Sequence, residues 1–266
     1  MSIKRFALIG LGAVIVLAGI GFVAFNLLTT NNTAPSSALT AIPVTISTAT
    51  PLATTAAASV SANATTATPA GVSATANPTS AATASAAGVV VYQIVPEQSK
   101  VSFTITEELN GQPNTVVGTT NLVAGQLALD AQDLSQSQVG VIKVDARGLA
   151  TDNDRRNGAI RNFILNTDQY EYITFTPKSI SGLSGAGKTG QAFTFQLTGD
   201  LTIRHVTKSV TFDVTAQGAS AGEITGTAKA TVSRSDYNLT IPNVPNVANV
   251  GEQVSLQIDF VASSAA

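Results

Sequence analysis

From Gly88 to the C-terminus, apolar and polar residues alternate along the chain with a period of two. The clearest run places Val101, Phe103 and Ile105 between polar neighbours. Strict alternation over about 4–8 residues is typical of a β-strand with one apolar and one polar face. Comparable runs follow at Ile173–Phe175, Phe193–Leu197, Leu201–Ile203, Val210–Ala216, Ile224–Val232 and Val254–Phe260. About eight strands with short connections predict an all-β domain, either an antiparallel sandwich or a closed barrel.

Two dipeptides in this region are turn signals. Asn110-Gly111 and Gly199-Asp200 each lie between alternating runs. Such pairs are typical of tight connections between neighbouring strands, because glycine and asparagine tolerate the backbone angles that turns require. The sequence therefore predicts a turn at both positions.

Residues 151–166 interrupt the alternation. Ile160, Phe163 and Ile164 have the i, i+3, i+4 spacing of one helical face. Thr151 or Asp152 is a suitable residue to cap the start of a helix. We expect a short helix, or a helical turn, whose apolar stripe packs over one end of the sheet.

The most continuous apolar stretch lies near the N-terminus, at residues 6–28. It holds one polar side chain, Asn26, close to its end. About 20 apolar residues suffice for a helix to cross a bilayer, so residues 6–28 are predicted to be a transmembrane anchor. Lys4 and Arg5 place residues 1–5 in the cytoplasm by the positive-inside rule. The chain would then be single-pass in the cell membrane, with its C-terminal domain outside, periplasmic or extracellular. A cleaved secretory signal is the alternative, although its apolar stretch is usually about 7–15 residues long.

Residues 29–87 consist mainly of alanine, threonine, serine and proline, with no charged and no aromatic residue. Alanine buries too little area to offset the entropy of an ordered chain. This segment is therefore predicted to be a disordered linker, and residues 88–266 the folded domain. The composition also permits an O-glycosylated stalk, and Asn31 and Asn63 match the N-glycosylation pattern.

Charge is scarce and unevenly distributed. Charged residues make up 11% of the chain, against roughly 25% in soluble domains. After Lys4 and Arg5 the next charged residue is Glu97. Because these two positive charges lie outside the domain, the net charge of the domain is more negative than the −2 of the whole chain. An acidic domain is a poor partner for nucleic acid. The absence of cysteine excludes disulfides, cysteine nucleophiles and thiolate-bound metals, and we expect no cofactor.

The candidates for catalysis are few. His205 is the only histidine, so a serine–histidine triad would have to use it, and a histidine-rich metal site is excluded. We expect it to be an exposed loop residue between two strands. Glu107 and Glu108 could in principle supply paired carboxylates for sugar hydrolysis. The chain, however, has no tryptophan to form a sugar platform, and we expect a protein that is not an enzyme.

Two groups of charged residues have a structural and a functional interpretation. The denser group comprises Asp152, Asp154, Arg155, Arg156 and Arg161. Arginine at a position where a calcium loop needs an oxygen ligand argues against that metal. The group is then either a set of mutually paired surface charges or a phosphate site. Arg234 and Asp236, two residues apart, are expected to share a strand face and to tie the strand end to a neighbour.

Four segments resemble the YceI-like family: Tyr92–Ile105, Thr151–Ile180, Leu197–Val214 and Ala230–Leu239. The third, with the run GDLTIRHVTKSVT, carries the most specific likeness. The resemblance implies an antiparallel eight-stranded lipocalin-like barrel that binds polyisoprenoid or other long-chain lipids without catalysis. The chain departs from the family pattern at Asn157, His205 and Ser209.

If the apolar face encloses an open interior, its side chains are the candidate lipid contacts, with Phe163 near the mouth. The predicted lining consists of Phe103, Ile105, Phe163, Ile173, Phe175, Phe195, Leu201, Ile203, Phe212, Val214, Leu256 and Ile258. The same residues could instead form a filled core. The chain would then be a surface-displayed structural or interaction module without a small ligand. A hydrolase with a polar cleft around His205 or paired acids is the third hypothesis.

Overall fold

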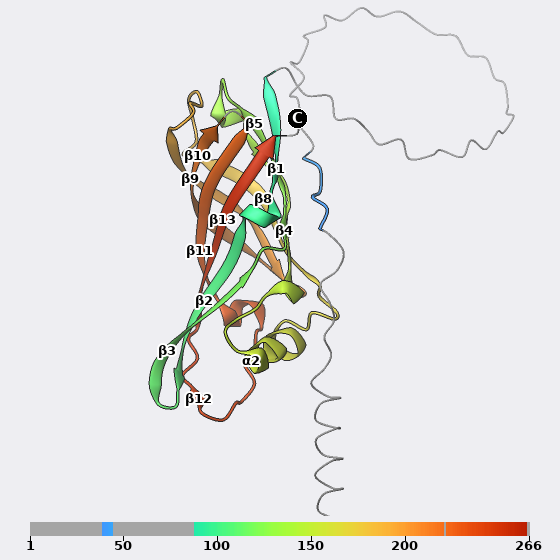
Figure 1. The fold of residues 1–266 in the computed structure, drawn as a ribbon, viewed down its shortest axis with the longest axis vertical. Helices are drawn as coiled ribbons and strands as arrows, with labels where there is room; N and C mark the ends of the chain where they lie inside the picture. Colours follow the sequence, from blue (N-terminus) through green and yellow to red (C-terminus); the bar gives the residue numbers. More distant parts are fainter. Residues whose placement is uncertain (1–38, 45–87, 221, 265–266) are drawn as a thin grey trace, which may run out of the picture.

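The computed structural model describes residues 39–44, 88–220 and 222–264. The predicted anchor at residues 6–28, and all of the predicted linker except residues 39–44, lie outside them. Within the described residues, no helix is long and apolar enough to cross a membrane. The domain is a curled antiparallel sheet with one short helical segment at one end, α2 (Figure 1).

Thirteen strands of the described residues make up the sheet, and some of them are consecutive parts of longer, bent strands. They are β1 (Val89–Ile94), β2 (Lys100–Leu109), β3 (Gln112–Thr120), β4 (Val123–Ala124), β5 (Gln126–Asp130), β6 (Gln138–Val139), β7 (Ile142–Asp145), β8 (Tyr172–Ser181), β9 (Ala192–Ile203), β10 (Val206–Ser220), β11 (Glu223–Ser233), β12 (Val247–Ala248) and β13 (Gln253–Ser264). Short helices connect them: η1 (Pro96–Gln98), η2 (Leu134–Gln136), η3 (Ala146–Gly148), α2 (Asp154–Ala159), η4 (Ile160–Ile164) and η5 (Arg234–Tyr237).

The strand order is β4-β7-β8-β9-β10-β11-β13-β1-β5-β6, and β2 pairs with both β13 and β3. The longest ladders join consecutive strands: β8 with β9, β9 with β10, and β10 with β11. Strand β13 pairs with β2 along its first half and with β1 at its end. The chain bends between β1 and β2 at Pro96, which cannot donate a ladder hydrogen bond.

Two inward-facing phenylalanines lie over glycines that are their direct partners in the ladder. A Cβ added at Gly118 would lie 2.2 Å from the Phe103 ring, and one at Gly226 would lie 2.6 Å from the Phe260 ring. Each of these pairs is directly opposite in the ladder. Glycine therefore makes room for a large ring on the inner face of a strongly curved sheet.

The two predicted turns have different outcomes. Asn110 and Gly111 have φ of 53° and 74° and connect β2 to β3, so that prediction is confirmed. The turn at Gly199-Asp200 was wrong, because β9 runs straight through it. A Cβ at Gly199 would lie 2.7 Å from the Phe175 ring. This glycine therefore provides space for an aromatic ring, and the chain reverses later, at Arg204, with φ of 57°.

The predicted short helical segment is confirmed, with corrections to its start and its inward face. Asn153 caps α2, its side chain accepting hydrogen bonds from the N–H groups of Arg155 and Arg156; neither Thr151 nor Asp152 is the cap. Helix α2 continues directly into η4, a π-helical turn in which the N–H of Leu165 donates to the Ile160 carbonyl at 2.8 Å. The segment packs across one end of the curled sheet, in the lower half of Figure 1.

A seam runs down one side of the sheet, where the ladders are short. β4 pairs with β7 through two residue pairs, and β5 pairs with β6 through two more. Gly140 lies between β6 and β7, and its N–H donates to the Gln126 carbonyl at 2.8 Å. Residues 39–44 pack against this seam, although they belong to the predicted linker: the Val44 N–H donates to the Gln126 side-chain oxygen at 3.0 Å.

Candidate functional site

The interior of the curled sheet holds a row of four apolar cavities. Their volumes are about 210, 60, 90 and 170 Å³ from the end that carries the β8–β9 loop to the end covered by α2. Neighbouring cavities share lining residues: Phe195 lines the first and second, Ile258 the second and third, and Leu256 the third and fourth. The row therefore follows the long axis of the interior.

The two middle cavities are the narrow part of this row, and we call them the waist. Phe175 and Phe212 line both of them. Their rings meet edge to face, with centroids 5.0 Å apart and an interplanar angle of 73°. Such pairs are attractive by about 0.5–1.5 kcal/mol beyond their area burial. A long ligand would have to move these two rings to occupy both ends at once.

Eleven of the twelve predicted lining residues lie at these cavities. The α2 end holds Phe103, Ile105, Ile173, Ile203 and Leu256. The waist holds Phe175, Leu201, Phe212, Val214 and Ile258, and Phe195 lies between the waist and the far cavity. The structure thus brings these side chains together around one apolar interior.

Phe163 does not join them. Its side chain is 70% exposed and lines none of the four cavities. The prediction placed Phe163 and Ile164 on one face by α-helical spacing, but η4 is a π-helical turn. Its wider turn aligns Ile160 with Ile164, and these two residues line the cavity at the α2 end. Phe163 therefore points outward.

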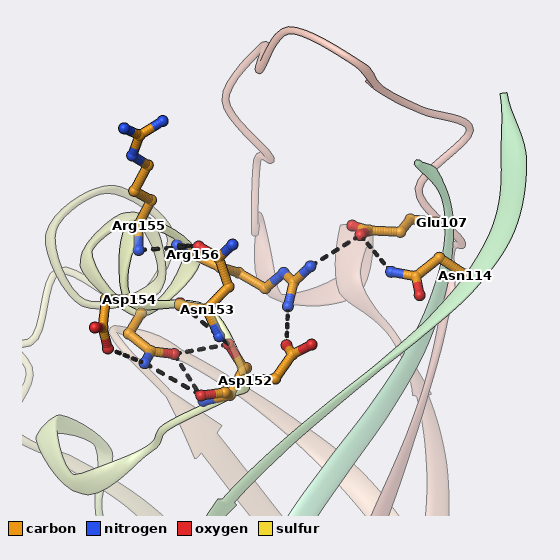
Figure 2. Close-up of polar contacts among 9 residues, drawn as sticks. Glu107, Asn114, Asp152, Asn153, Asp154, Arg155 and Arg156 are labelled. Carbon is orange, nitrogen blue, oxygen red and sulfur yellow. Dashed lines mark hydrogen bonds and ion pairs between the residues drawn. The ribbon is translucent and has the colours of Figure 1, made fainter. Parts of the chain in front are cut away.

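An acidic side chain enters the cavity at the α2 end. Glu107 is only 8% exposed and lines this cavity together with Arg156 and Arg234. Figure 2 shows the Arg156 guanidinium between Glu107 and Asp152, and Asn114 reaching Glu107 from β3. Arg156 lies 3.2 Å from Glu107, and the Asn114 amide donates to the same carboxylate oxygen at 2.9 Å. We call Glu107, Asn114, Asp152 and Arg156 the polar corner.

Period-two alternation was sufficient to predict that Glu107 faces the interior. In the sequence analysis, however, Glu107 was considered only as half of a catalytic pair. Phe103, Ile105 and Glu107 are two residues apart on β2, so the rule that turns the first two inward turns the third inward as well. Asp152 and Arg156 pair with each other, in agreement with the mutually paired interpretation of the charged group. Arg155 extends away from the corner in Figure 2.

Further ion pairs hold the α2 end together. Arg147 contacts both Glu171 and Asp145, the latter at 3.3 Å and only 1% exposed. Arg234 pairs with Glu252 at 3.4 Å and donates to the carbonyls of Gly251 and Leu239. Arg234 and Asp236 lie in the 3-10 helix η5, so the prediction of a shared strand face was wrong.

Tyr237 is the largest fully buried side chain at this end, with 1% of its surface exposed. Its hydroxyl has no hydrogen-bond partner among the described residues. Burial, with a smaller contribution from the nearby Asp236, raises the pKa of Tyr237 to about 12. The ring therefore acts as an apolar anchor for η5.

The opposite end of the row, which we call the loop end, is covered differently. Its cavity is lined by residues of the β8–β9 loop and the β10–β11 turn, including Leu183, Gly187 and Gly222. Gly182, Gly185 and Gly190 in the loop and Gly222 in the turn all have positive φ. These connections depend on glycine because other residues rarely adopt that conformation.

The catalytic candidates do not assemble into a site. His205 is exposed in the turn between β9 and β10, where its ring lies 5.7 Å from that of Tyr170. In the described part of the chain, no group of three or more histidine, cysteine, aspartate or glutamate side chains is arranged to hold a metal ion. Glu107 is contacted by Arg156 and Asn114, and the rest of the cavity that it lines consists mainly of aliphatic and aromatic side chains.

Comparison with known proteins identifies the family. The model of the YceI-like domain matches residues 92–262. The chain therefore belongs to the YceI-like family. No curated protein sequence matches the chain.

Two solved structures have the same fold. A polyisoprenoid-binding domain from Saccharophagus degradans, implicated in plant cell wall breakdown, aligns with a TM-score of 0.52 and 15% identity, covering 66% of this chain and 99% of that one. BcnA of Burkholderia cenocepacia aligns with a TM-score of 0.51 and 20% identity, covering 64% of this chain and 99% of the other. At these identities the likeness concerns the fold.

Proposed function

We propose that this protein binds a polyisoprenoid or another long-chain lipid in its interior and presents it outside the membrane that anchors the chain. The row of apolar cavities with shared lining residues is the observation that carries this proposal. Family membership supports it, and so does the fold shared with the polyisoprenoid-binding domain from Saccharophagus degradans. Binding needs no reacting group, which fits an interior of apolar side chains.

The strand pairings support an eight-stranded lipocalin-like barrel around this interior. Counting β1–β2, β3–β5 and β6–β7 as three bent strands gives eight strands with β8, β9, β10, β11 and β13. Each then pairs with two neighbours, and the seam between β3–β5 and β6–β7 is the step that completes the ring. Eight strands enclose an interior wide enough for one small or elongated ligand.

The energetics of burial suit such a ligand. Each buried methylene contributes about 0.8 kcal/mol, while a micromolar dissociation constant corresponds to about 8 kcal/mol. A few isoprene units therefore suffice, even after the cost of ordering the chain. Parting Phe175 and Phe212 at the waist would reduce this gain by about 0.5–1.5 kcal/mol.

The location outside the membrane is part of the proposal. It is supported by the apolar stretch at residues 6–28 with Lys4 and Arg5 before it. Lipids of this kind reside in the bilayer and dissolve poorly in water, so a tethered binding domain would meet its ligand at the membrane surface.

A cavity-filling substitution tests the binding site directly. Ala228 is 9% exposed and lines the waist, whereas Thr231 lies on the outer face of the same strand. We expect Ala228→Leu in the full-length chain to weaken binding of a fluorescent isoprenoid probe at least tenfold. Thr231→Leu, the matched control, should bind like the unaltered protein. Equal binding by both variants, with both folded by circular dichroism, would place the lipid outside this interior.

A further inference from the structure

One segment of the predicted linker is held by the domain. Residues 39–44, drawn in blue in Figure 1, run beside the curled sheet. Ala41 and Val44 are 6% and 7% exposed, as buried as the domain core, while Ile42 between them is 45% exposed. We call residues 39–44 the strap. Two of its side chains are therefore buried, and the two residues between them are exposed.

The domain surface beneath the strap is shaped for it. The Val44 N–H donates to the Gln126 side-chain oxygen at 3.0 Å. A Cβ at Gly140 would lie 2.7 Å from a Val44 methyl group and 3.2 Å from the Gln126 carbonyl oxygen, so a larger residue here would have to displace the Val44 side chain. Gly140 has no unusual φ that would itself require glycine, which makes close approach of the strap a sufficient reason for glycine at this position.

The sequence of the strap suits this role. Leu39, Ile42 and Val44 lie within six residues, in a linker whose apolar content is otherwise mostly alanine. Pro43 restricts Ile42 to extended backbone, so the segment is partly ordered before it docks. The site it covers is the seam, where Leu127, Val139 and Ile142 of the same strands line the waist on the inner side.

We propose that the strap docks on the seam of its own domain and thereby shortens the membrane tether. This inference concerns the tether of the proposed function and therefore rests on the anchor at residues 6–28. With the strap docked, residues 29–38 alone connect the anchor to the domain, which corresponds to a root-mean-square reach of roughly 16–19 Å. The full linker of residues 29–87 would reach roughly 40–45 Å. Docking thus holds the lipid-binding domain close to the bilayer.

Distance measurement between two spin labels tests the docking itself. The chain has no cysteine, so Ile42→Cys and Thr231→Cys introduce the only labelling sites, both exposed. In the full-length chain we expect one narrow distance distribution. Val44→Asp, which leaves the domain sequence intact, should broaden it, as should Gly140→Val. The controls are Thr40→Asp, at an exposed strap position, and Gly158→Ala, where a Cβ meets nothing within 4 Å; both should keep the distribution narrow.

Two results would contradict the proposal that the strap docks on the domain of its own chain. One is a distribution as broad in the unaltered strap as in Val44→Asp. The other is loss of the narrow component when labelled protein is diluted with unlabelled protein, which would mean that the strap binds a second copy.

The tether is tested separately, on chains reconstituted into vesicles that carry a paramagnetic lipid headgroup. The paramagnetic headgroup speeds the relaxation of a spin label at Thr231→Cys when the domain is near the bilayer. This enhancement should decrease when Val44→Asp is added, because the released domain spends more time far from the bilayer. If the distance between the two labels is narrow but Val44→Asp leaves the relaxation unchanged, the strap docks but does not shorten the tether. Neither readout involves lipid binding in the interior, so failure here and failure of the proposed function are distinguishable.

Discussion

The two ends of the interior share the same apolar strands but are covered in different ways. At the α2 end, a helical segment packs over the cavity, and buried charges such as Glu107 and Asp145 are paired around it. At the loop end, connections with glycines at positive φ surround the cavity. Opening a packed helical cover breaks many buried contacts, whereas moving a surface loop breaks few. We therefore expect a firm floor at the α2 end and a ligand entrance at the loop end.

The largest expected effect is at Tyr237, in the floor. Truncating this fully buried ring with Tyr237→Ala should lower the free energy of unfolding by about 3–5 kcal/mol, because the cavity left behind cannot collapse completely. Tyr237→Phe keeps the ring and removes a hydroxyl without a partner among the described residues, so it should change stability by less than about 1 kcal/mol. Urea unfolding measures both. A large loss in Tyr237→Phe would contradict the view of this ring as an apolar anchor.

The same residue predicts an alkaline dependence. The pKa of Tyr237 is raised to about 12 in the folded chain, against 10 for the unperturbed group. The folded state therefore retains a proton that the unfolded state loses, and this contribution to stability is full below pH 10 and lost as the pH rises to 12. The unaltered chain should therefore lose stability relative to Tyr237→Phe over this range. A difference that is constant with pH would mean that Tyr237 titrates normally.

The polar corner comes next in size. Glu107→Gln removes the charge that Arg156 contacts at 3.2 Å, and it should cost about 1.5–3 kcal/mol. Glu108→Gln is the matched control, since the adjacent side chain faces the opposite side of β2, and this substitution should change the free energy of unfolding little.

The polar corner also predicts a ligand preference. It already pairs Arg156 with two carboxylates, so it favours an uncharged lipid end over a phosphorylated one. Competition between an isoprenoid alcohol and its diphosphate should favour the alcohol, and Glu107→Gln should reduce that preference.

Replacing an aliphatic side chain by tryptophan at each end compares the two ends directly. Ile160→Trp overpacks the floor, where Ile160 is 6% exposed, and should cost about 1–3 kcal/mol. Leu183→Trp in the β8–β9 loop should cost less than about 1 kcal/mol, because the loop can shift. Leu183→Trp should nevertheless slow uptake of a fluorescent isoprenoid more strongly than Ile160→Trp does. The reverse order of uptake rates would move the entrance to the α2 end.

The smallest expected effect is on the wall between the ends. Lys178 and Asp200 lie 2.7 Å apart, but their side chains are 59% and 31% exposed. Exposed pairs of this kind contribute little, so Lys178→Ala should change the free energy of unfolding by about 0.5 kcal/mol or less. A thermal unfolding curve that shifts as far as that of Glu107→Gln would remove the distinction between buried and exposed pairs on which the comparison depends.

Alternation predicted β2, β8, β9, β10, β11 and β13 and most of the interior, because both depend on a local, two-residue period. It gave no run for β1 or for the strands from β3 to β7. Phe103, Ile105 and Leu256 lie at the cavities for this reason. Gly199 was misjudged because a glycine that makes room for Phe175 and a glycine in a turn look alike in a sequence. The distinction depends on a neighbouring strand that is distant along the chain.

The other differences have similar causes. Phe163 was placed inward by α-helical spacing, whereas η4 is a π-helical turn in which Ile160 and Ile164 line the cavity. The strap was missed because composition averaged over residues 29–87 conceals a short apolar segment, and its burial depends on Gln126 and Gly140 in the domain. In both cases tertiary contact decided what local pattern could not.

Extraction of the native ligand tests the central claim most directly. Full-length protein purified in mild detergent from its own membranes should be extracted with organic solvent and the extract analysed by mass spectrometry, with Ala228→Leu prepared in parallel. We predict about one long-chain isoprenoid or related lipid per protein from the unaltered chain, and at least tenfold less from Ala228→Leu. Equal lipid in the two samples, or none in either across repeated gentle preparations, would contradict a lipid-binding interior.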